Sequence, residues 1–287
     1  MSAQLVDQPD LAAAVLARRA ARRESRRPIL AVAGRLLSWA ISLAVVLGAW
    51  QLFLVVFHVN KFIGRGPLDV WRYLTSSADA GTARSRLLHN SGTTLRDAFI
   101  GLAAGTFAAV LFAILFNLRR SVEQTFMPIA MVLRSVPLVA MTPLIALVFG
   151  RGLMCVTIVA GIVTFFPTLV NVTLALRATP AASIDLGRAY GASRLTMLRK
   201  VQIPSSLPAL FASLRVSAPL ALVGAVLAEF LVTGSGLGYL IETSMASSIY
   251  NQLWAGVALI TLYSTVLYTA ISGIEKLVLA RFADLPT

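Results

Sequence analysis

The sequence predicts an all-α protein that crosses a membrane several times. Hydrophobic residues make up 57% of the chain and charged residues only 13%, and the mean hydropathy is +0.80. About a quarter of the residues of a soluble domain are charged. Several apolar runs exceed the roughly 20 residues that a helix needs to cross about 30 Å of hydrocarbon. A transmembrane barrel is excluded, because its strands give alternating segments of about ten residues.

Apolar stretches with few charges place six spans along the chain. The third region is interrupted by three prolines, and a proline in the fourth predicts a kink. A short amphipathic stretch lies between the first and second spans. The predicted spans are residues 36–60, 98–118, 122–150, 152–176, 208–231 and 254–278. The predicted organisation is a basic cytoplasmic segment at 1–35, the first span at 36–60, an extracytoplasmic segment at 61–96, a core transmembrane domain at 97–281 and a cytoplasmic tail at 282–287.

Basic residues set the expected orientation. With the N-terminus inside, the cytoplasmic segments hold 17 lysines and arginines and the outer segments hold 7. Cytoplasmic loops carry the excess of basic residues in membrane proteins, so we expect both termini in the cytoplasm and the chain in the inner (plasma) membrane. The net charge of +13 does not indicate nucleic-acid binding, because the basic residues gather at the ends of apolar runs.

A polar segment, residues 179–202, separates the fourth and fifth spans and is predicted to be cytoplasmic. Ser183 can cap a short helix that runs to about Tyr190, and Ser193 can cap a second one. Gly191 permits a sharp turn between them, and Pro204 is expected to end the second helix before the fifth span. The predicted elbow presents an outward face made of Arg188, Tyr190, Arg194 and Leu195.

The spacing of this segment is similar to that of a known loop. Asp185-Leu186-Gly187, then Gly191, then Ile203-Pro204 resembles the EAA loop of binding-protein-dependent ABC transporter permeases, with Asp185 in the place of the family's glutamate. Two further stretches, Leu133–Pro137 and Ala228–Leu231 with the following Gly236–Ile241, resemble the nitrate, sulfonate and taurine-type permeases.

The resemblance implies a type I importer fold with cytoplasmic coupling helices. It also implies a partner set: a cytoplasmic ATPase subunit, an extracytoplasmic solute-binding protein and a second permease copy in a homodimer. The solute would be small and polar or anionic, such as nitrate, a sulfonate or taurine. The residues that would couple the chain to the ATPase are Asp185, Gly187, Arg188, Tyr190, Gly191, Arg194, Leu195, Ile203 and Pro204.

The chain carries no nucleotide-binding motif of the Walker A type, which requires Gly-Lys-Ser/Thr. Its three lysines, Lys61, Lys200 and Lys276, follow Asn, Arg and Glu. We therefore expect no enzymatic activity and no cofactor in this chain, with ATP and Mg²⁺ in the partner subunit. His58 and His89 are too scattered for a metal site.

Two charges, Arg134 and Glu229, lie deepest in apolar surroundings. Intramembrane charges are costly and face a cavity or a partner. One hypothesis places both in the substrate pathway, and the other joins them in an ion pair between two spans. Gly101 and Gly105, at GxxxG spacing, predict close helix packing.

Two other functions remain open at this stage. An ion-coupled secondary transporter would use Glu229 or Asp97 as its proton or cation site, although such folds often carry inverted repeats and the two halves of this chain show no convincing one. A membrane scaffold would recruit cytoplasmic proteins through the polar segment without transporting anything.

Overall fold

The computed structural model describes residues 37–283, and the side chains as far as residue 280, and within that range the secondary structure is helical. The chain divides into two compact units, Met1–Pro67 and Leu68–Thr287. The predicted basic segment at 1–35 and the end of the predicted tail, residues 284–287, lie outside the described residues.

The described part of the first unit contains one apolar helix. Leu37–Val56 is 20 residues long, which suffices for one membrane crossing. Most of its side chains are exposed on every face, as expected of a helix surrounded by lipid. The helix ends four residues before the predicted limit at residue 60.

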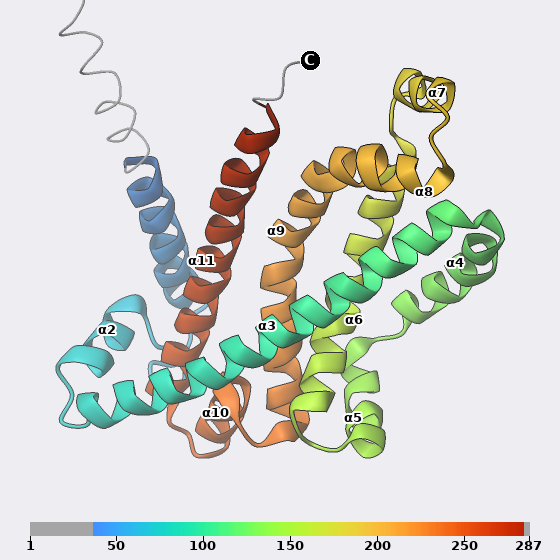
Figure 1. The fold of residues 1–287 in the computed structure, drawn as a ribbon. Helices are drawn as coiled ribbons and strands as arrows, with labels where there is room; N and C mark the ends of the chain where they lie inside the picture. Colours follow the sequence, from blue (N-terminus) through green and yellow to red (C-terminus); the bar gives the residue numbers. More distant parts are fainter. Residues whose placement is uncertain (1–36, 284–287) are drawn as a thin grey trace, which may run out of the picture. The chain divides into compact units, whose positions relative to one another are not determined.

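Three long helices form the core of the second unit: α3 (Ala80–Leu118), α6 (Leu153–Arg177) and α9 (Ile203–Ala228). α3 and α6 pack along each other, α6 packs against α9, and α11 (Tyr250–Ala283) lies along α9 (Figure 1). The predicted close packing at Gly105 is confirmed, because a Cβ there would lie 2.1 Å from Thr164 Oγ1 and 2.5 Å from the Gly161 carbonyl oxygen.

α3 is longer than predicted, because its helix begins within the segment 61–96 that the sequence predicts to be extracytoplasmic. The short helix α2 (Pro67–Thr75) comes first, and α3 then begins at Ala80, 18 residues before the predicted start of the second span. The extension is amphipathic. Its buried positions recur every three or four residues: Ala80, Ala83, Leu87, Ser91, Thr94 and Asp97. That spacing gives one buried stripe on a helix.

The third region is a broken span. α4 (Arg120–Ser135) and α5 (Leu138–Phe149) are bent by 104° at the break around Pro137. At 1.5 Å per residue they are about 24 and 18 Å long, so neither crosses about 30 Å of hydrocarbon alone. The described residues thus hold five long apolar helices, or six if the bent pair counts as one span.

The fifth span is one continuous helical rod, Arg194–Thr233, of 40 residues. It comprises α8 (Arg194–Met197), the π-helical turn η1 (Leu198–Gln202), α9, and a second π-helical turn, η2 (Glu229–Thr233). The prediction that Pro204 ends a short helix is therefore wrong. Pro204 lies in the first turn of α9, directly after the π turn has changed the hydrogen-bond register, so the helix passes through the proline.

The rod connects the two ends of the second unit. α7 (Ala181–Ala189) and α8 lie at one end, and α5 and α10 (Gly236–Ala246) lie at the other (Figure 1). The predicted break after Glu229 is present, because Gly234 has a φ of 73° and separates η2 from α10.

Candidate functional site

The polar segment between α6 and α9 folds into an elbow of two short helices, α7 and α8, as the sequence predicts. Gly191 turns the chain between them with a φ of 71°. Ser193 caps α8, because its Oγ accepts a hydrogen bond from the Thr196 backbone N–H at 3.2 Å. The local sequence therefore specifies both the turn and the start of the second helix.

The first helix begins earlier than predicted. Ser183 is not its cap, because α7 starts at Ala181 and Ser183 lies inside the first turn. Pro180 holds the N-cap position, and its carbonyl accepts hydrogen bonds from the backbone N–H groups of Ser183 and Ile184. α7 therefore begins without a side-chain cap.

The predicted outward face of the elbow is exposed. Arg188, Tyr190, Arg194 and Leu195 are all accessible, and Tyr190 is 84% exposed. Asp185 is also exposed and pairs with Arg188 at 3.4 Å, a surface contact that contributes little to stability. Ile203 and Pro204 are instead half-buried at the start of α9.

Gly187 has a packing role that its sequence context did not reveal. A Cβ at this position would lie 2.0 Å from Met197 Cε. Met197 is a buried residue of α8. The glycine thus makes room for the methionine that fills the inside of the elbow.

The elbow is fixed to the membrane helices by side chains on its inner side. Leu198 is buried in a cluster with Phe116 of α3 and Leu176 of α6. Asn117 Nδ2 of α3 donates a hydrogen bond to Gln202 Oε1 of η1 at 2.8 Å. A cavity of about 260 Å³ lies beside this bond and is lined by Leu118, Ile184, Arg188, Ala192, Arg194 and Met197, together with Asn117 and Gln202.

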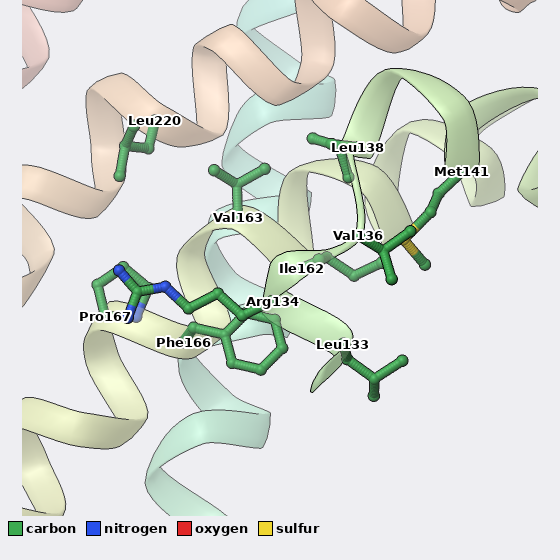
Figure 2. Close-up of a pocket in the computed structure, with 10 residues that line it drawn as sticks. All are labelled: Leu133, Arg134, Val136, Leu138, Met141, Ile162, Val163, Phe166, Pro167 and Leu220. Atoms are coloured by element: carbon green, nitrogen blue, oxygen red, sulfur yellow. The ribbon is translucent and has the colours of Figure 1, made fainter. Parts of the chain in front are cut away.

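Arg134 lines a separate pocket of about 260 Å³, where α4 bends into α5 (Figure 2). Its side chain extends over Phe166 and Pro167 in the middle of α6. The other lining residues are apolar: Leu133, Val136, Leu138, Met141, Ile162, Val163 and Leu220. Arg134 is therefore the one charge in the lining of this pocket.

Glu229 lies elsewhere, at the start of η2, and is 1% exposed. Its Oε2 accepts hydrogen bonds from Thr94 Oγ1 at 2.8 Å and from the Gly238 backbone N–H at 2.9 Å. It does not line the pocket of Arg134, so the geometry gives no support to its predicted place in the substrate pathway.

The alternative ion pair between Arg134 and Glu229 is not formed. Ion pairs among the described residues include Arg96 with Asp97, Glu123 with Arg177, Asp185 with Arg188, and Arg215 with Glu275. Asp97, the second candidate for a cation site, is thus already paired with Arg96 at 2.8 Å. The part of the chain that the structure describes holds no cluster of three metal-ligating side chains.

Sequence reasoning missed Asn90, Thr94, Asn117 and Gln202. Asn90 and Thr94 stand one turn apart on α3 and both bond to α10. The sequence feature that could have indicated them is a stripe of polar residues at helical spacing, directly before the apolar part of α3. Asn117 and Gln202 are ordinary polar residues at span ends, and no sequence pattern connects them.

A bundle of apolar helices, one of them broken, with a polar elbow built into one span, is the architecture of a multi-pass membrane protein. The chain matches the family described as "Binding-protein-dependent transport system inner membrane component" over residues 101–284. It belongs to that family, which consists of the permease subunits of ABC importers.

Curated relatives and solved structures agree with this assignment. A probable ABC transporter permease protein of Haemophilus influenzae is 28% identical over 83% of this chain and 94% of its own. A riboflavin transport system permease protein of Chloroflexus aurantiacus is 35% identical over 55% of this chain and 59% of its own. A chain of the MetNI methionine ABC transporter, solved in an inward-facing conformation, has a similar fold, with a TM-score of 0.57 and 21% identity over 71% of this chain and 99% of that one.

Proposed function

We propose that this chain is the transmembrane subunit of an ATP-driven importer and that its elbow, α7 and α8, docks on a separate ATPase subunit. The observation that carries the proposal is the construction of the elbow. Its outer face exposes Tyr190 and Leu195, while Leu198, directly after α8, is buried in a cluster with residues of α3 and α6. Apolar and aromatic side chains on an exposed polar loop are typical of a protein interface.

The elbow is built so that a push on its outer face reaches the spans. α8 continues through η1 into α9 without a break. The Asn117–Gln202 hydrogen bond ties the same point to the end of α3. Glu123 of α4 pairs with Arg177 at the end of α6, beside the start of the elbow. Closure of the ATPase would thus displace several helices together and change the side from which the pathway is open.

Membership of the family implies the other subunits of the transporter. ATP and Mg²⁺ would bind the ATPase subunit, a solute-binding protein would deliver the solute outside, and a second copy of this chain would complete a homodimer in the inner membrane. The elbow and the C-terminal end of α11 lie at the same end of the second unit (Figure 1), which agrees with a cytoplasmic C-terminus. The excess of basic residues predicts that the N-terminus is cytoplasmic as well.

Arg134 is our candidate for the solute contact. It stands beside the middle of α6, at a break between two half-helices. Secondary transporters place solute sites near the bilayer midplane at discontinuous helices, and we infer the same use of the break here. The described residues offer its guanidinium no acidic partner, so an anion or a strong hydrogen-bond acceptor would complete the site. Relatives named for sulfonates, nitrate and taurine fit a small polar or anionic solute.

Uptake into proteoliposomes tests the proposal. The permease is reconstituted with its ATPase and binding protein, and uptake of radiolabelled taurine, an alkanesulfonate and nitrate is measured with and without internal ATP. We expect uptake that needs all three components and ATP. Uptake driven by an ion gradient without the ATPase would show a secondary transporter, and no uptake of any solute would favour a scaffold; either result contradicts the proposal.

The role of Arg134 needs a matched pair of variants. Arg134→Gln removes the charge and is expected to lower uptake at least tenfold, while Arg134→Lys keeps the charge and retains part of the uptake, because a lysine cannot reproduce the planar guanidinium contact. Arg120→Gln, at the exposed other end of α4, is the control. Normal uptake by Arg134→Gln at normal protein levels would remove Arg134 from the pathway.

A further inference from the structure

The first turn of α10 is held by side chains from two other elements. The backbone N–H groups at the start of a helix have no partners within the helix. Here the Gly236 N–H donates to Asn90 Oδ1 at 3.2 Å, the Leu237 N–H to Thr94 Oγ1 at 2.8 Å, and the Gly238 N–H to Glu229 Oε2 at 2.9 Å. Three successive donors of α10 are thus satisfied by α3 and η2.

Glu229 and Thr94 join these contacts into one network. The Thr94 hydroxyl donates to the Glu229 carboxylate at 2.8 Å while it accepts from Leu237. Both side chains are buried, at 0% and 1% exposure. A carboxylate at a helix N-terminus is stabilised by the helix dipole, and a bond inside a low-dielectric environment is stronger than one in water. The network therefore attaches α10 to α3 and η2 at three successive backbone groups.

The fit at this attachment is tight. A Cβ on Gly236 would lie 2.2 Å from Glu229 Cδ, and a Cβ on Gly238 would lie 2.2 Å from the Val226 carbonyl oxygen. These glycines let the backbone of α10 reach the carboxylate. Because closely packed interfaces move as units rather than deform, we expect a displacement of η2 to carry the start of α10 with it.

The position of α10 gives this attachment a consequence for transport. Glu229 stands at one end of the 40-residue rod Arg194–Thr233, and the elbow stands at the other. α10 has 11 residues, about 16 Å of helix, which is too short to cross the membrane. It lies at the end of the unit opposite the elbow (Figure 1).

We propose that α10 is the outer gate of the pathway and that Glu229 and Thr94 are the positioning residues that make it follow the rod. This inference rests on the proposed function, since a gate has a meaning only in a transporter with alternating access. A movement of the elbow at the cytoplasmic end reaches α10 through the rod, and the network with Asn90, Thr94 and Glu229 converts it into opening or closing at the outer end.

A cysteine on α10 reports the state of the gate. Cys155 is the single cysteine of the chain, so a Cys155→Ala background carrying Met245→Cys has one accessible thiol on α10, where Met245 is exposed. The complete transporter in proteoliposomes is labelled with a membrane-impermeant thiol reagent, once without nucleotide and once trapped with ATP and vanadate. We expect the labelling rates of the two states to differ by about fivefold or more, the lower range of coupling between distant sites.

Variants of α3 then test the positioning pair. Thr94→Val removes the hydroxyl with little change of shape and is expected to abolish the difference between the two states and to lower uptake per ATP hydrolysed. Thr94→Ser keeps the hydroxyl and is expected to retain both the labelling difference and the uptake per ATP hydrolysed. Ser91→Ala is the matched control, because the buried Ser91 hydroxyl bonds only within its own helix, to the Leu87 carbonyl. If Thr94→Val fails to assemble, two variants of Glu229 replace it in the test. Glu229→Gln keeps an acceptor oxygen and is expected to retain more of the labelling difference between the two states than Glu229→Ala.

Two outcomes overturn the proposal. Equal labelling of Met245→Cys in both states, in a transporter that is active, removes α10 as the gate. A difference that persists unchanged in Thr94→Val and Glu229→Ala shows that this pair does not position α10. A failure of the proposed function is a separate result, because it appears as the absence of ATP-driven uptake before any variant is made.

Discussion

Asn117 of α3 donates a hydrogen bond from its side-chain amide to Gln202 of η1 at 2.8 Å, across 85 residues of sequence. The bond joins the end of one core helix to the π turn through which the elbow enters the fifth span. π turns often mark functional positions in helices. The bond therefore lies where a movement of the elbow would pass into the core of the second unit.

Breaking this bond is expected to separate ATP hydrolysis from uptake. Asn117→Ala and Gln202→Ala each remove one partner of a half-buried hydrogen bond, which contributes about 1 kcal/mol. We expect each variant to hydrolyse ATP while importing less solute per ATP, and the double variant to be no worse than either single one, because both remove the same contact. Uptake and phosphate release measured in the same proteoliposomes give the amount of solute imported per ATP hydrolysed. Gln124→Ala, an exposed amide on α4, is the control, and additive losses would contradict the prediction.

The turn at Gly191 requires a residue that accepts a positive φ. Gly191 has a φ of 71°, and the space around a Cβ there is open. Only backbone strain therefore opposes a substitution, at about 1–2 kcal/mol for most residues and less for asparagine. We expect Gly191→Val to lower ATP-driven uptake strongly and Gly191→Asn to keep most of it. Equal activity of the two variants would show that the turn does not matter for coupling.

The Glu123–Arg177 ion pair ties α4 to α6 near the elbow, but its arginine is 40% exposed. Exposed pairs contribute about 0.2–1 kcal/mol and are screened by salt. Glu123→Gln should therefore lower the free energy of unfolding by less than about 1 kcal/mol at low salt, with no difference at high salt. Denaturation of the purified permease in detergent at two NaCl concentrations measures this. A loss that persists at high salt would mean that the pair is held by more than charge.

Much of the fold follows from sequence patterns that act locally. The apolar runs predict the spans, and the turn chemistry of Gly191 and Ser193 predicts the elbow. The errors arise where two local rules compete. Pro204 is a helix breaker by type, yet it lies in the first turn of a helix after a π turn, where a missing N–H costs least. The start of α3 was missed because its polar residues hide a buried stripe that begins at Ala80.

The residues of the candidate site also fall into those that the sequence predicts and those that it does not. The elbow residues are contiguous in sequence, so their spacing reveals them. Thr94 and Glu229 are not contiguous, because 135 residues separate them, and no periodicity within one helix indicates a contact with another. For the same reason the sequence could not decide between the two hypotheses for Arg134, a place in the pathway or an ion pair with Glu229. Sequence places both charges in apolar surroundings, but only the fold places Arg134 at the bend of α4 and α5 and Glu229 beneath α10.

The close contact of α3 with α6 at Gly105 makes a prediction with an internal control on the same helix. A methyl group at Gly105 would meet Thr164 Oγ1 at 2.1 Å and the backbone of Gly161 at 2.5 Å. Backbone atoms cannot yield as the end of a side chain can, so Gly105→Ala should force α3 and α6 apart and lower the free energy of unfolding by about 1–3 kcal/mol, the usual range for overpacking.

Gly92, also on α3, is the control, because a Cβ added there would have no atom within 4 Å. Gly92→Ala should therefore be neutral, or stabilising by up to about 1 kcal/mol through the better helix propensity of alanine. Thermal unfolding of the two variants in the same detergent measures the contrast, and a Gly105→Ala protein as stable as Gly92→Ala would show that the two helices do not pack this closely.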